Sequence, residues 1–134
     1  MNQILKQKLH NDYHKMNLKK IKNLQGFSGN EGTDIKQIFQ PTNTENGIRY
    51  SVAHCTINPG KSSKSHIMKT SEVYYIVQGT GIMHVNDESE IVSKDMSVYI
   101  PPNCKQYLEN NGEVDLIALC IVDPAWKKDD EISE

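Results

Sequence analysis

Short runs of apolar and β-branched residues, separated by turn residues, fill the chain from Lys22 onward. In some runs apolar positions alternate with polar ones, and in others both faces are apolar, as in half-buried and fully buried strands. We see no convincing helical periodicity between the runs. Their close spacing predicts an antiparallel all-β sandwich or barrel with one pocket at its mouth. The expected strands cover residues 34–41, 48–57, 71–79, 81–87, 88–93, 96–102, 105–112 and 114–122.

The two ends of the chain depart from this pattern. Residues 1–15 are polar with apolar residues at helix-like spacing, which predicts a short amphipathic extension in front of a domain that covers residues 16–134. His10 and His14 lie four residues apart in this extension, a spacing that can hold a metal on one helix face. Two histidines on a solvated arm is the favoured interpretation. The acidic tail, KKDDEISE, is expected to fray.

Composition narrows the class of protein. The chain has 134 residues, of which 24% are charged, and a formal net charge of -2, so a nucleic-acid partner is not expected. No apolar run is long enough to cross a membrane, and the N-terminus lacks the apolar core of a signal peptide. The three cysteines, Cys55, Cys104 and Cys120, are widely spaced and form no CxxC pair. Free thiols in a reducing cytoplasm are the expected state.

A cluster of candidate ligands lies in the middle of the chain. His66 and Met68 are two residues apart and share one face of an extended segment. If Glu72 faces inward, alternation places Tyr74 on the same face. Gln106 follows a Pro-Pro corner further along and can approach the same point. The pattern predicts that the side chains of His66, Met68, Glu72 and Gln106 converge on one cavity.

The spacing of these residues resembles the two motifs of the cupins. Their first motif runs Gly, five residues, His-x-His, three or four residues, Glu, six residues, Gly, and residues 60–79 keep each spacing with Met68 in place of the second His. Their second motif runs Gly, five residues, Pro-x-Gly, two residues, His, three residues, Asn. Residues 95–110 keep that order with Asp95, Asn103 and Gln106 in place of Gly, Gly and His. Asp and Asn tolerate a left-handed backbone, so the two glycine replacements are structurally mild.

The resemblance implies a fold and a set of metal ligands. It extends from about residue 16 to the end and is closest to small mannose-6-phosphate-isomerase-like cupins, which implies a single jelly-roll barrel, or double-stranded β-helix, and a homodimer. The ligand positions of the family fall on His66, Met68, Glu72 and Gln106. Only His66 and Glu72 keep the family's ligand type. The thioether of Met68 is a soft donor, and Gln106 offers a neutral carbonyl oxygen.

Three states of this site stay open at the level of the sequence. The site can hold Zn, Fe or Mn weakly, it can prefer copper with help from Cys104 or His54, or it can have lost the metal and bind an organic ligand. In the first state, Met68 is expected to line an apolar wall.

The expected ligand is a small oxygenated molecule such as a sugar or keto acid. A metal-dependent isomerase, lyase or oxygenase would use Glu72 or Tyr74 to move a proton. The rival hypothesis is a binding module without catalysis.

Overall fold

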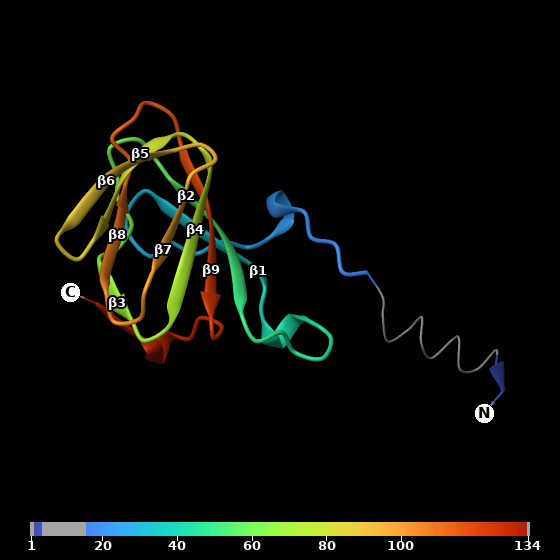
Figure 1. Cartoon of the computed structure of the whole chain (residues 1–134). Coiled ribbons are helices and arrows are strands. Elements are labelled where there is room, and N and C mark those ends of the chain that lie inside the picture. The colour runs from blue at the N-terminus through green and yellow to red at the C-terminus, as the bar shows by residue number, and fades with distance from the viewer. Residues whose placement is uncertain (1, 4–15, 134) are drawn as a thin grey trace.

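The computed structural model describes residues 2–3 and 16–133 and consists of two antiparallel sheets that enclose a barrel (Figure 1). One five-stranded sheet has the order β1-β2-β9-β4-β7, and the other has the order β10-β3-β8-β5-β6. The predicted all-β fold is therefore confirmed. The strands are β1 Thr33–Phe39, β2 Ser51–Ile57, β3 His66–Met68, β4 Ser71–Gln78, β5 Thr80–Val85, β6 Glu88–Ser93, β7 Ser97–Ile100, β8 Lys105–Glu109, β9 Leu116–Asp123 and β10 Glu131–Ser133; three short 3-10 turns are η1 Ile21–Asn23, η2 Pro41–Asn43 and η3 Lys128–Asp130.

The predictions for the two ends of the chain have different outcomes. The predicted helical extension, with His10 and His14, lies almost wholly outside the described residues. Fraying of the acidic tail is wrong for residues 131–133, because β10 pairs with β3 and gives the backbone of that edge strand a partner. Within the described residues, none of the helices is both long and apolar enough to span a bilayer.

Alternation along the strands sets the barrel interior. On β9, the residues at 116, 118, 120 and 122 are buried, and those between them are half-buried. On β4, Glu72, Tyr74 and Ile76 point inward, whereas Tyr75 and Val77 are exposed, as the sequence predicted. Because β4 and β9 are paired, their inward residues form one continuous wall of the interior.

Two turns explain how the second motif tolerates the loss of its glycines. Asp95 has a φ of 69° and Asn103 a φ of 66°, which places both in the left-handed region. Glycine visits this region freely, and Asp and Asn visit it more readily than other residues. The corners on either side of β7 are therefore preserved without glycine.

The last residue of the second motif, Asn110, fastens two loops from inside the protein. It is fully buried, and its amide nitrogen donates to the carbonyl oxygens of Ile57 at 2.8 Å and Val114 at 2.9 Å, while its side-chain oxygen accepts from the backbone N–H of Gly112 at 2.9 Å. We expect Asn110→Ala to lower the free energy of unfolding by about 3 kcal/mol, because buried backbone groups lose their partners. Urea denaturation measures the loss. The exposed neighbour supplies the control, since Asn111→Ala should change stability by less than about 0.5 kcal/mol. Equal effects at both positions would contradict this role.

Candidate functional site

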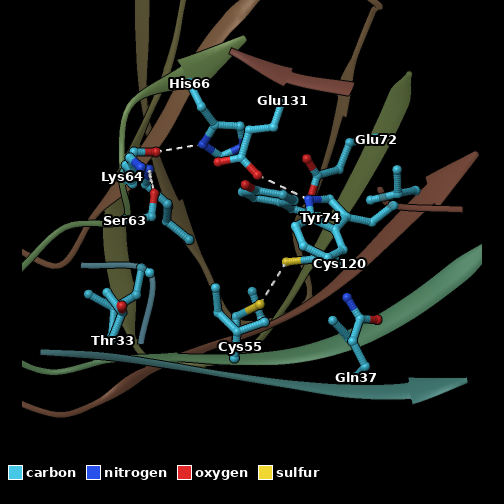
Figure 2. A pocket seen from close by; sticks show the side chains of 18 of the residues that line it. Thr33, Gln37, Cys55, Ser63, Lys64, His66, Glu72, Tyr74, Cys120 and Glu131 are labelled. Atoms are coloured by element: carbon cyan, nitrogen blue, oxygen red, sulfur yellow. Dashed lines mark hydrogen bonds between the residues drawn. The ribbon is translucent and has the colours of Figure 1, made fainter. Parts of the chain in front are cut away.

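A cavity with a volume of about 130 Å³ lies inside the barrel (Figure 2). One water molecule needs roughly 10–15 Å³ by the same kind of measure, so the cavity has room for an organic ligand. Its walls come from both sheets and are mostly apolar. The apolar lining comprises Phe27, Ile35, Ala53, Ile57, Met68, Leu108, Ala118, Val122 and Trp126, and the ionisable or polar lining includes Lys64, His66, Glu72, Tyr74, Glu131 and the two cysteines Cys55 and Cys120.

Glu72 brings a carboxyl group into this apolar environment. Its side chain is only 5% exposed, and burial raises its pKa from 4.5 to about 8. The nearby Gln106 amide and Cys120 thiol favour the charged form, but their effect is smaller than that of burial. Neither Oε1 of Glu72 nor Nε2 of Gln106 has a well-formed hydrogen bond to a described residue. At neutral pH the site therefore holds a protonated carboxyl with unused hydrogen-bonding capacity.

Tyr74 and Gln106 form a buried, hydrogen-bonded pair close to Glu72. The Tyr74 hydroxyl donates to Oε1 of Gln106 at 2.8 Å, and burial raises the pKa of Tyr74 well above its ordinary value. Gln106 is only 1% exposed and is not among the residues that line the cavity. The side-chain carbonyl oxygen of Gln106, a predicted metal ligand, is thus directed toward Tyr74, and the ring of Tyr74 forms part of the cavity wall.

His66 and Met68 line the cavity from β3. The ring atom Nδ1 of His66 lies 2.6 Å from the carbonyl oxygen of Lys64, so Nδ1 donates in this contact, and in the neutral ring Nε2 is then the nitrogen with the lone pair. Met68 is 2% exposed and forms part of the apolar wall. The motif spacing predicts that four side chains, those of His66, Met68, Glu72 and Gln106, meet in one cavity. The structure brings His66, Met68 and Glu72 to the cavity wall. Gln106 does not line the cavity and is hydrogen-bonded to Tyr74 instead.

The donors at this site fit a hard or borderline divalent ion poorly. The predicted ligand positions bring one imidazole, one carboxyl and one thioether to the cavity wall, while the Gln106 oxygen already accepts from Tyr74. The second carboxyl of the wall, that of Glu131, already accepts from the indole N–H of Trp126. Among residues 2–3 and 16–133, no group of three or more His, Cys, Asp and Glu side chains is arranged to hold a metal ion. Cys104 and His54, the candidate helpers of a copper site, do not line the cavity. Burial, followed by the charge of Lys36, lowers the pKa of His54.

Two residues near the C-terminus complete the cavity and were not predicted as site residues. Glu131 lies on β10 opposite Met68, and the indole nitrogen of Trp126 donates to Oε2 of Glu131 at 3.0 Å. The ring centroids of Trp126 and Phe27 are also 6.2 Å apart. The acidic, polar tail gave no strand signal, so only the antiparallel pairing with β3 shows that Glu131 faces the site.

The fold and the site define a small two-sheet β-barrel protein with an apolar internal cavity and a buried carboxyl in the wall of that cavity. The family model described as a cupin domain matches residues 53–122, which is more than half of the chain, and the chain belongs to this family. A relative from Methanocaldococcus jannaschii, an uncharacterized protein, is 34% identical over 101 residues, which cover 75% of this chain and 80% of the relative.

A second relative and two solved structures match with lower coverage or with lower identity. A mannose-1-phosphate guanylyltransferase from Salmonella montevideo is 34% identical over 88 residues, which cover 64% of this chain but only 18% of that enzyme. A predicted oxalate decarboxylase from Thermotoga maritima has a TM-score of 0.71 at 19% identity, with 81% of this chain and 99% of that chain covered. The polyketide cyclase RemF from Streptomyces resistomycificus has a TM-score of 0.70 at 13% identity, with 81% of this chain and 79% of that chain covered. These two structures support the fold alone.

Proposed function

We propose that the barrel cavity binds a small, neutral and mainly apolar molecule that carries one hydrogen-bond acceptor, such as a ketone oxygen. The observation that carries this proposal is the protonated Glu72 carboxyl, which is buried in an apolar cavity and has an unpartnered oxygen. A buried polar group without a partner costs free energy, and a ligand carbonyl that accepts a hydrogen bond from the protonated Glu72 carboxyl removes that cost. A metal is not required for this binding, and the donor set favours the metal-free state.

The same carboxyl supports a proton-transfer role. A group whose pKa is about 8 both gives up and takes back a proton at moderate cost near neutral pH. A carbonyl ligand that accepts a hydrogen bond from Glu72 becomes more acidic at the adjacent carbon, and the proton released from that carbon in enol formation would pass to Nε2 of His66 in the same cavity wall. We assign proton donation to Glu72, and we assign a positioning role to Tyr74, since its hydroxyl proton is already directed at Gln106.

Ligand binding can be followed through Trp126, the single tryptophan of the chain, because its side chain lines the cavity. We expect a cyclic ketone such as cyclohexanone to change the emission of Trp126 saturably, and mannose 6-phosphate to leave it unchanged. Glu72→Leu should weaken ketone binding about 10-fold, as expected for the loss of one buried hydrogen bond. Glu113→Leu, at an exposed position outside the cavity, is the matched control and should bind like the wild type.

The outcomes of this titration separate the hypotheses. Binding of the sugar phosphate with no response to the ketone would contradict an apolar ligand and favour the polar substrates expected from the sequence. Ketone binding that Glu72→Leu leaves unchanged would remove Glu72 from the site. Isomerisation of a bound ketone would distinguish a catalyst from a binding module. It can be measured as exchange of the α-hydrogens of the ketone with deuterium from the solvent.

We further propose that a second copy of the chain covers the outer face of the β1-β2-β9-β4-β7 sheet. This face carries apolar side chains, among them Tyr75, Val77 and Tyr99, which are 38%, 37% and 63% exposed. Exposed apolar side chains that share one face of a sheet are typical of an interface. Val77→Glu combined with Tyr99→Glu should convert a dimer into a monomer in light scattering. Ile91→Glu, at a 69% exposed position on the other sheet, should leave the dimer intact. A wild type that is monomeric at high concentration would contradict this proposal.

The proposed cellular compartment rests on the cysteines. Cys55, Cys104 and Cys120 are all free thiols in the structure. Free thiols persist in a reducing environment, so we propose a cytoplasmic location. Alkylation of the freshly isolated protein and mass measurement would count the free thiols, and an oxidised cysteine pair would contradict the proposed compartment.

A further inference from the structure

Two cysteine thiols meet at the cavity wall, and the proposed function does not use them. Cys55 lies on β2 and Cys120 on the neighbouring β9, and both side chains line the cavity. Their sulfur atoms are 3.2 Å apart, with the Cys120 thiol donating to Sγ of Cys55 (Figure 2). The carboxyl of Glu72 lies near Cys120, and each of the two groups influences the pKa of the other. The pair is therefore a dithiol with access to the ligand space.

The register of the two strands disfavours a direct bond between these sulfurs. Cys55 is paired with Ala118, and Cys120 is paired with Ala53, so the two cysteines are diagonal neighbours rather than direct partners. Diagonal residues have Cα atoms about 7–8 Å apart, whereas disulfides usually join Cα atoms about 4.4–6.8 Å apart. A disulfide would require the backbone to move. A single atom that bonds to both sulfurs could bridge them without movement of the backbone.

The separation of the sulfurs indicates which kind of atom fits between them. With bonds of about 2.3 Å to each sulfur, as for zinc, a separation of 3.2 Å corresponds to an angle of about 90° at the bridging atom. That angle is narrower than the tetrahedral angle zinc prefers and far from a linear arrangement. It suits a three-coordinate pyramidal centre, whose bonds lie close to right angles. Trivalent arsenic is such a centre, and it binds thiols strongly.

We propose that Cys55 and Cys120 form a chelating site for trivalent arsenic compounds, in particular those with one apolar substituent. The two sulfurs and the substituent complete the three bonds of arsenic, so no further protein ligand is needed. The resulting complex is neutral, which matters because a charge in an apolar cavity would be costly. The apolar walls around the dithiol provide contacts for the substituent. This inference goes beyond the proposed function and does not depend on the identity of the organic ligand.

The binding reaction is balanced without an oxidant. For an arsenic centre that carries one substituent and one doubly bonded oxygen, two arsenic–sulfur bonds form and the arsenic–oxygen bond breaks. The oxygen leaves as one water molecule, which takes up the two thiol protons. Arsenic stays trivalent, and both sulfurs keep their oxidation state.

The probe for the experiment is phenylarsine oxide, with arsenite as a second arm that lacks the apolar group. Intact-mass measurement of the wild-type chain should show one adduct, with the mass of phenylarsine oxide less one water. A dithiol such as 2,3-dimercaptopropanol should remove the adduct, and a monothiol should not. Cys55→Ala and Cys120→Ala should each bind about 100-fold more weakly, since the second sulfur acts at high effective concentration. Cys104→Ala is the matched control and should bind like the wild type, because Cys104 does not line the cavity.

A second measurement avoids dependence on the folding of the variants. In the wild-type chain, the arsenical should protect Cys55 and Cys120 from alkylation by iodoacetamide and leave the reactivity of Cys104 unchanged. Tighter binding of phenylarsine oxide than of arsenite would support contacts between the substituent and the cavity. Absence of an adduct in the folded chain, when the urea-unfolded chain forms one, would overturn the proposal. So would an adduct that Cys104→Ala removes and Cys55→Ala retains.

Discussion

Between about pH 5 and pH 8, the free energy of unfolding of the wild-type protein should fall by about 4 kcal/mol relative to that of Glu72→Gln. In the folded protein, Glu72 keeps its proton up to a pKa of about 8, whereas its ordinary pKa is 4.5. Over this range the unfolded chain therefore binds fewer protons at this group than the folded chain does. Stability must then decrease as the pH rises. The contribution is fully present below about pH 4.5 and is lost once the pH passes about 8.

Glu72→Gln isolates this effect because glutamine has nearly the same shape and does not titrate. The two proteins should have similar stabilities near pH 5, and the variant should be the more stable near pH 8. Urea denaturation at matched pH values gives the difference. Glu113→Gln changes an exposed carboxyl and should follow the wild type throughout. Parallel curves for the wild type and Glu72→Gln would show that Glu72 is ionised in the folded state at neutral pH.

Replacing Met68 and Gln106 by histidine should raise the affinity for Zn or Ni by at least about 100-fold, because each added donor acts at high effective concentration. His66 and Gln106 are direct partners across β3 and β8, Met68 is two residues further along β3, and Glu72 faces the cavity from β4. The new imidazoles would join His66 and Glu72 in a set of three nitrogens and one carboxylate. Bound metal would also lower the pKa of Glu72 and reverse its protonation.

Titration calorimetry of the double variant measures this gain. The matched control combines Met68→Leu with Gln106→Leu, which changes the same positions without adding donors and should bind as weakly as the wild type. Met68→Leu alone should leave metal content unchanged, since a thioether in an apolar wall is a poor donor for these ions. No gain in the histidine variant would mean that the geometry of the pocket, and not only its ligand types, has moved away from metal binding.

The barrel and the inward direction of the motif residues could be predicted because they depend on local chemistry. Alternation along β4 correctly placed Glu72 and Tyr74 on one face. Asp95 and Asn103 occupy left-handed corners, as residues of these types can. Such features follow from the period of the strands and from the steric limits of the backbone.

The parts of the site that escaped prediction depend on contacts between distant segments. The side chain of Gln106 accepts a hydrogen bond from Tyr74, and the position of Gln106 in the sequence does not predict that contact. Glu131 reaches the cavity only because β10 adds to the edge of β3. Cys55 and Cys120 meet because β2 and β9 are adjacent, which a spacing of 65 residues along the chain does not reveal.

The position of the cavity between the two sheets has a consequence for finding the natural ligand. Both sheets contribute walls to the cavity, so a chain that has lost either sheet has no binding site. A ligand therefore binds only the fully folded state, and its whole binding free energy is added to that of unfolding. At a ligand concentration 100 times the dissociation constant, this addition is about 2.7 kcal/mol. In a domain of this size it raises the melting temperature by roughly 5–15 °C. Thermal denaturation of the unlabelled protein against a compound library would thus identify ligands without an assay for any particular reaction.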